Sequence, residues 1–95
     1  MIYSRHMALF CNRQVSKGFF HSMVVSQTYD DDKSPTWHWK VEDLLEPSVI
    51  AEGIEPSEEA GMSKAIQAHE LSARKVLNGP LPQDDYLWHV APEPD

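Results

Sequence analysis

The chain lacks a second cysteine, a long apolar run and any clustering of its glycines. The single Cys11 excludes an intrachain disulfide and fits a reducing, cytosolic setting. No apolar run approaches the roughly 18–20 residues of a membrane span, so we expect no membrane association. The four glycines stand singly, which excludes a glycine-rich loop that cradles phosphate: Gly18, Gly53, Gly61 and Gly79.

The sequence also lacks the spacing of a metal or cofactor site. Its five histidines include no pair at i,i+2 or i,i+4, and zinc sites commonly show such pairs. A calcium loop beginning at the run Asp30–Asp32 needs glycine sixth and glutamate twelfth, where Pro35 and Val41 stand. We therefore expect no metal and no cofactor, and interpret the run as a solvated hairpin tip.

No signature of a catalytic centre surrounds the nucleophilic side chains. Cys11 with one of the histidines would in principle form a thiolate pair, but a free cysteine is commonly a small buried apolar residue. Ser57 and Ser63 lack the G-x-S-x-G elbow of hydrolases. We expect a protein without enzymatic activity, and keep a small enzyme using Cys11 or a histidine as an alternative hypothesis.

The most readable element is a helix over residues 57–78. Apolar residues recur there at steps of three and four, so one face is apolar. His69 lies on that face and is expected to be half-buried in the core. Either Ser57 caps the start or Pro56 is the first helical residue, and Gly79 in the left-handed conformation ends the helix.

Two strands are expected before the helix. Thr36–Glu42 alternates cleanly between apolar and polar residues, as in an antiparallel sheet with one covered face. Phe19–Tyr29 is rich in aromatic and β-branched residues but alternates less well, which indicates a bulge or a central strand covered on both faces. Residues 30–35 form the turn between them by composition, so the two strands make a hairpin.

Weaker strand signals complete the pattern. Ser48–Ile54 reads as a third strand, and Ile2–Cys11 favours a strand over a short helix. Tyr86–Val90 is expected to pack back on the core or to add an edge strand. We assign residues 1–90 to a single domain and residues 91–95 to a flexible tail.

Strands followed by one helix indicate an α+β fold. We predict an antiparallel sheet of three to four strands, with one long helix from the C-terminal half of the chain packed on one face. That arrangement would bury seven apolar side chains together: Trp37, Trp39, Val41, Ile50, Ile54, Ile66 and Val76.

Charge is divided sharply along the chain. Residues 1–29 contain three basic residues and no acid, for a formal charge of +3, and residues 30–95 contain fifteen acids and five basic residues, for −10. The acidic excess favours a basic partner over nucleic acid or an anionic membrane. The absence of acids before residue 30 is equally explained by burial of that segment in the sheet.

Two groups of side chains are candidates for contact with a partner. The acids of the hairpin loop and of the segment after the next strand are expected to form one anionic steering face: Asp30, Asp31, Asp32, Glu42, Asp43 and Glu46. Trp88 is the best interface candidate among the tryptophans, because it lies in the C-terminal segment and tryptophan is enriched in protein interfaces.

Residues 36–78 carry a family resemblance. The segment combines Trp37-x-Trp39-x-Val41 with a stretch that begins Val49-Ile50-Ala51-Glu52-Gly53 and leads through Ser57-Glu58-Glu59-Ala60 into the helix. This cadence resembles small acidic phage and mobile-element proteins, which include anti-CRISPR proteins.

The resemblance implies a function through protein binding. It implies an inhibitor that binds a basic surface of a host protein or ribonucleoprotein, such as a CRISPR effector complex, and blocks nucleic-acid access. No direct nucleic-acid binding by this chain is expected. The alternative hypothesis is a non-enzymatic structural module that forms homo-oligomers through an edge strand or the Trp88 segment.

Overall fold

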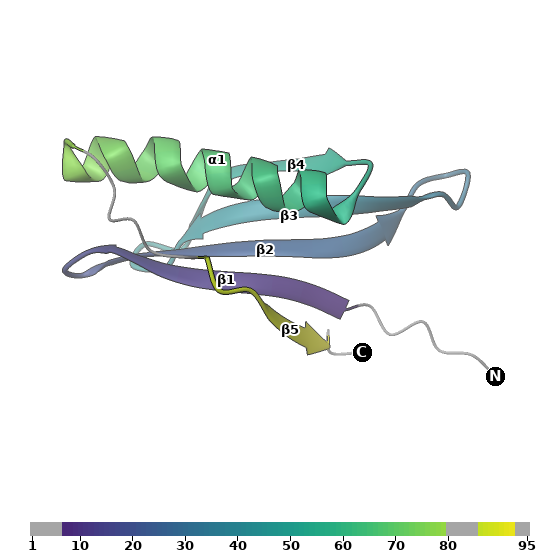
Figure 1. The fold of residues 1–95 in the computed structure, drawn as a ribbon, viewed down its shortest axis with the longest axis horizontal. Coiled ribbons are helices and arrows are strands. Elements are labelled where there is room, and N and C mark those ends of the chain that lie inside the picture. Colours follow the sequence, from purple (N-terminus) through teal and green to yellow (C-terminus); the bar gives the residue numbers. More distant parts are fainter. Residues whose placement is uncertain (1–6, 80–85, 93–95) are drawn as a thin grey trace.

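The structure, a computed structural model, describes residues 7–79 and 86–92 of the chain. These residues form one antiparallel five-stranded sheet with one helix across one of its faces (Figure 1). The strands lie in the order β4-β3-β2-β1-β5. We call the face under the helix the helix face and the other the open face. The elements are β1 (Met7–Ser16), β2 (Phe19–Tyr29), β3 (Pro35–Asp43), β4 (Ser48–Glu55), α1 (Glu58–Leu77) and β5 (His89–Pro92).

The α+β class and the antiparallel sheet are confirmed, but the sheet has five strands rather than three to four. The additional edge strand is β5, which pairs with β1 through Leu9–Val90 and Phe10–His89. It includes Ala91 and Pro92, which the sequence placed in a flexible tail, and residues 93–95 of that tail lie outside the described range. β1 runs further than predicted, to Ser16, and residues 1–6 of the predicted N-terminal strand also lie outside the described range.

The helix begins and ends close to the predicted residues. Ser57 is the N-cap, and its Oγ accepts a hydrogen bond from the Ala60 backbone N–H at 3.1 Å. At the other end Asn78, not Gly79, takes the left-handed conformation, with φ of 55°, and its N–H donates to the Arg74 carbonyl at 2.8 Å. Asparagine is the residue after glycine that most often adopts this conformation at a helix end.

The helix faces the sheet with small side chains instead of large apolar ones. Its buried residues follow at every fourth position: Gly61, Ala65, His69 and Ala73. Val76, which we expected in the core, is 40% exposed, and Ile66 packs only at the edge of the core. The small residues allow a close approach, since a Cβ at Gly61 would lie 3.0 Å from Cγ1 of Val25.

The core lies between the helix and the inward residues of the three inner strands. Its centre is formed by four buried residues: Cys11, Met23, Val41 and Ala65. Trp39 and Ile50 pack against this centre as predicted, but Ile54 is 64% exposed. Ile54 pairs with His38 on the open face, because alternate residues of a strand point to opposite faces. Ile50 still reaches the core because a bulge opposite Val41 shifts the alternation within β4.

The close contact between Gly53 and Trp39 gives a stability prediction. A Cβ at Gly53 would lie 2.7 Å from Nε1 of Trp39 and 2.9 Å from two carbons of the same indole. We expect Gly53→Ala to lower the free energy of unfolding by about 1–3 kcal/mol, because the indole has to move from its place in the core. Urea denaturation measures the loss.

Gly79→Ala is the matched control, since the nearest atom to its added Cβ is 4.0 Å away. We expect it to change stability by less than about 0.5 kcal/mol. Equal losses in the two variants would contradict the contact with Trp39 as the cause.

Candidate functional site

The hairpin loop between β2 and β3 uses one of its three aspartates to hold its own shape. Oδ1 of Asp30 accepts hydrogen bonds from the backbone N–H groups of Asp32 at 3.0 Å and Ser34 at 2.9 Å. The Asp30 carbonyl also accepts from the N–H of Lys33, whose φ is 62°. Asp31 and Asp32 are exposed at the tip. The Asp30 carboxylate is therefore structural, and the other two are available to a partner.

The six acids predicted to form one steering face lie in two groups. Asp30, Asp31 and Asp32 precede β3, whereas Glu42, Asp43 and Glu46 lie at its other end. β3 has nine residues, and at about 3.3 Å per residue the two groups are roughly 30 Å apart.

Two acids of the second group already have partners within the chain. Glu42 forms an ion pair with Lys40 at 3.0 Å. Asp43 Oδ1 accepts hydrogen bonds from the N–H groups of Leu45 at 2.9 Å and Glu46 at 3.4 Å. The second group is therefore largely engaged in local structure.

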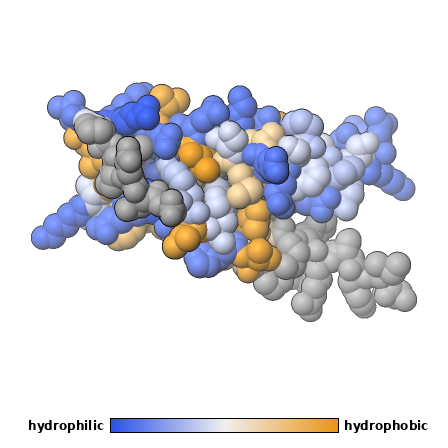
Figure 2. Space-filling model, in the orientation of Figure 1, coloured by the Kyte–Doolittle hydropathy of each residue, from blue (hydrophilic) through white to orange (hydrophobic). Residues whose placement is uncertain are grey.

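The fold brings other acids to the hairpin. β4 ends and α1 begins beside it, because Glu55 pairs with Trp37 near the start of β3 (Figure 1). We call this end of the molecule the acidic end; it carries six carboxylates and one ammonium group, a formal charge of −5: Asp30, Asp31, Asp32, Lys33, Glu55, Glu58 and Glu59. Hydrophilic side chains cover it, at the right in Figure 2. The acidic first turn of the helix was a visible signal, but only the register of β4 places it beside the hairpin.

The opposite end of the molecule is not acidic overall. It holds the turn between β1 and β2 and the C-terminal end of α1 (Figure 1). Lys17, Arg74 and Lys75 lie there, and they balance the three acids of the second group: Glu42, Asp43 and Glu46. Among the residues that the structure describes, the net negative charge is therefore concentrated at the acidic end.

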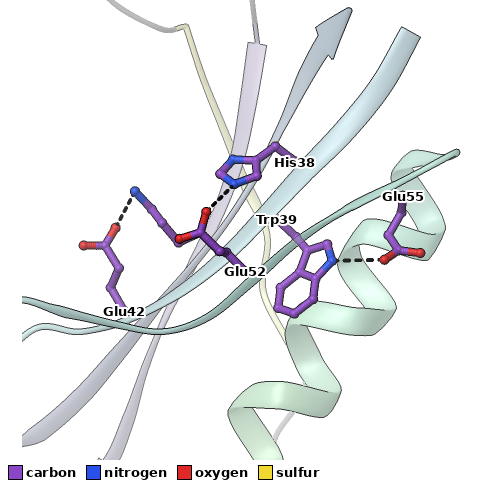
Figure 3. A network of polar contacts seen from close by, with 6 residues as sticks. His38, Trp39, Glu42, Glu52 and Glu55 are labelled. Carbon is purple, nitrogen blue, oxygen red and sulfur yellow. Dashed lines mark hydrogen bonds and ion pairs between the residues drawn. The ribbon is translucent and has the colours of Figure 1, made fainter. Parts of the chain in front are cut away.

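Trp88 and Trp39 both take part in the core. Trp88 is half-buried and packs against the core centre, so its indole already has a structural role. Trp39 Nε1 donates a hydrogen bond to Oε2 of Glu55 at 3.2 Å (Figure 3). This bond fixes one carboxylate of the acidic end to the helix face of the sheet.

A pair of histidines is buried where α1 crosses β2. His21 and His69 are each 1% exposed, and their Nδ1 atoms are 2.9 Å apart, so that one ring donates a hydrogen bond to the other. Burial of His69 is confirmed and is more complete than expected. His21 was not recognised from sequence, where it looked like one more residue of a mixed strand.

The environment keeps both rings neutral. Burial above all, together with the neighbouring His21 and Arg13, lowers the pKa of His69 to about 4, and Glu70 opposes this shift only in part. Burial also lowers the pKa of His21, opposed by the negative charge of Asp43. A neutral pair suits a hydrogen bond with one donor and one acceptor, since a doubly protonated pair has no acceptor.

Tyr86 extends this network to the C-terminal segment. Its ring meets His69 edge-on with centroids 5.9 Å apart, and its hydroxyl donates to Glu70 Oε2 at 2.8 Å. The Arg13 guanidinium lies 4.2 Å from the centre of the same ring. Burial and the bond to Glu70 raise the pKa of Tyr86 to about 12. Through these contacts the cluster holds β1, β2, α1 and the segment before β5 together, so its role is structural.

Cys11, the nucleophile of the alternative enzyme hypothesis, lies in the core. Cys11 is 1% exposed, and burial raises the pKa of its thiol, so it remains protonated at neutral pH. Among the described residues, no three histidine, cysteine or acidic side chains are grouped closely enough to hold a metal ion. Within the same residues, α1 is too polar to serve as a membrane-spanning helix.

Comparison with known proteins gives no relative. No family model, no curated protein and no solved structure matches this chain.

The loop geometry predicts different effects for neighbouring aspartates. We expect Asp30→Ala to lower the free energy of unfolding by about 1–2 kcal/mol, since two backbone N–H groups lose their acceptor. Asp31→Ala is the matched control and should stay within about 0.5 kcal/mol of the wild type. Thermal and urea denaturation give both values, and equal effects would contradict a structural role of the Asp30 carboxylate.

The histidine pair predicts a loss of stability in mild acid. His69 binds a proton near pH 6.5 in the unfolded chain but only near pH 4 in the folded protein. Stability from this group is therefore complete above about pH 6.5 and falls as the pH decreases towards 4, by at most about 3 kcal/mol. Urea denaturation between pH 7.5 and 4 measures the fall.

A double variant separates this fall from that caused by the carboxylates. We expect His21→Leu with His69→Leu to flatten the pH dependence between pH 6.5 and 4, because both partners become apolar. His38→Leu on the open face is the control and should keep the slope. An unchanged slope in the double variant would assign the whole effect to other groups.

Proposed function

We propose that the protein acts by binding a basic surface of a host protein or ribonucleoprotein through its acidic end. The observation that carries the proposal is the formal charge of −5 at the acidic end. Asp31, Asp32, Glu58 and Glu59 are exposed there. The described residues of the opposite end have balanced charge, so the partner is expected to approach from one direction.

The physical route is charge complementarity. A concentrated negative field speeds encounter with a Lys/Arg-rich surface and disfavours anionic competitors such as nucleic acid. The acidic end is rigid where it is tied to the fold, through the Asp30 turn and the Trp39–Glu55 hydrogen bond. The backbone that carries the exposed carboxylates therefore loses little conformational freedom on binding.

The resemblance of residues 36–78 to small phage and mobile-element proteins suggests which basic surface to test first. A CRISPR effector complex holds nucleic acid in a positively charged channel. A compact domain with carboxylates at one end would occupy such a channel and block access of the target strand. We therefore propose an anti-CRISPR type of inhibition as the first candidate activity.

Charge reversal at the acidic end is the decisive experiment. We expect Asp31→Lys with Asp32→Lys to weaken capture of the partner from host lysate at least about tenfold and to flatten its dependence on salt. The matched control is Glu42→Lys with Glu46→Lys, which reverses two charges at the other end of β3. Quantitative affinity capture at low and high salt compares the three proteins.

The outcomes are distinct. Loss of binding in the Asp31/Asp32 variant alone supports the acidic end, and loss in the control variant alone moves the site to the other end. Equal binding of all three proteins would overturn the electrostatic proposal. A gel-shift assay of target DNA with purified CRISPR effector complexes tests the inhibition directly.

A further inference from the structure

The open face of the sheet carries more apolar surface than a face turned only to water requires. Sheets with one solvated face usually carry polar residues on it. Here Phe20 is 41% exposed, Val49 is 49% exposed and Ile54 is 64% exposed, with the half-buried Phe10 and Val24 between them. All belong to positions that alternate with the residues of the core.

The charges of the open face are few and paired within the chain. Glu52 and His38 lie 3.2 Å apart, and Lys40 pairs with Glu42 (Figure 3). Trp39 and Glu55 belong to the other side of the sheet, towards the helix (Figure 3). With neutral histidines the described open face has a formal charge of −1, whereas the chain carries −7. Two copies of this acidic protein therefore meet little charge repulsion between their open faces.

Charged and uncharged side chains lie on different halves of the open face, so that one half complements the other half of a second copy. One register row crosses the whole sheet in the order Glu52, Lys40, Val24, Phe10 and His89. The two acids of the described open face, Glu42 and Glu52, lie on β3 and β4, on one side of the central strand β2. Among the described residues the β1–β5 side carries none, and those that are exposed or half-buried there are Phe10, Asn12, Gln14 and His89.

The central part of β2 carries small side chains on the open face. Ser22, Val24 and Ser26 line it on β2, and small side chains let two sheets approach to the usual spacing of about 10 Å. The four long strands, of 8 to 11 residues each and about 4.8 Å apart, present roughly 600 Å², and the short β5 adds little. Two such faces bury about 1,200 Å², which reaches the lower range of stable interfaces.

We propose that a second copy of this chain packs on the open face, with the two-fold axis running along β2. Val24 then meets Val24 of the second copy. Lys40 lies over Phe10 of the second copy, a cation–π arrangement, and Glu52 lies over its His89. No acid of one face lies opposite an acid of the other. This dimer uses a different surface from the acidic end and does not rest on the proposed function.

Sedimentation of the full chain tests the dimer. We expect the mass to rise with concentration from 10.8 kDa to twice that value, and added salt to strengthen association because it screens two acidic chains. Salt is expected to weaken binding of a basic partner, which is the opposite effect. The two proposals can therefore be tested, and can fail, independently of each other. A mass of one chain at every concentration up to the millimolar range would overturn the dimer.

Two variants of nearly equal exposure locate the interface. We expect Ile54→Glu on the open face to raise the dissociation constant at least tenfold, because the charge enters the interface twice. Leu71→Glu on the helix, where the native side chain is 62% exposed, should leave it unchanged. Equal dissociation constants for the two variants would exclude the open face, and a larger effect at Leu71 would place the interface on the helix.

A cross-link tests the axis and does not depend on a loss of association. Val24→Cys should be joined to a second copy by a short bis-maleimide, whereas Leu71→Cys should not, and the native Cys11 is buried. Circular dichroism confirms that each variant folds, with Val49→Glu replacing Ile54→Glu if that variant does not. A dimer in which Val24→Cys stays unlinked would exclude an axis along β2.

Discussion

The structure depends on the close approach of α1 to the sheet. Gly61, Ala65 and Ala73 keep the helix low, and that distance brings His69 onto His21, where each ring satisfies the other. The helix lies mainly over β2, β3 and β4 and covers the β1 side of the helix face less. Tyr86 and Trp88 fill that side from the C-terminal segment, which in turn positions β5 as the fifth strand. The burial of the two histidines is thus a consequence of small-residue packing. It also requires both imidazole rings to stay neutral in the folded protein.

Strand length and register decide the electrostatics. β3 separates acids that are close in sequence, and the register of β4 brings Glu55 and the first turn of α1 to the hairpin. The result is one strongly anionic end and one open face with paired charges. The two surfaces suit different partners: a basic molecule at the end, approached through long-range attraction, and a second copy on the face, held by apolar contact.

Much of the fold could be predicted from local patterns, because local physics controls those features. β2 occupies the predicted residues 19–29, and the helix begins after the predicted cap, Ser57. The predicted contents of the core were less accurate. The apolar periodicity of the helix pointed to Ile66 and Val76, but the line that faces the sheet is the neighbouring line of small residues, since packing favours the closer contact.

The sequence by itself determined the α+β class, the ends of the helix, the hairpin and the acidic excess after residue 29. These follow from side-chain periodicity, capping and composition, which act over a few residues. Only the tertiary structure decided which acids are neighbours and that His21 meets His69. Each of these depends on strand register and on the distance between helix and sheet, and both are set by contacts between residues far apart in the chain.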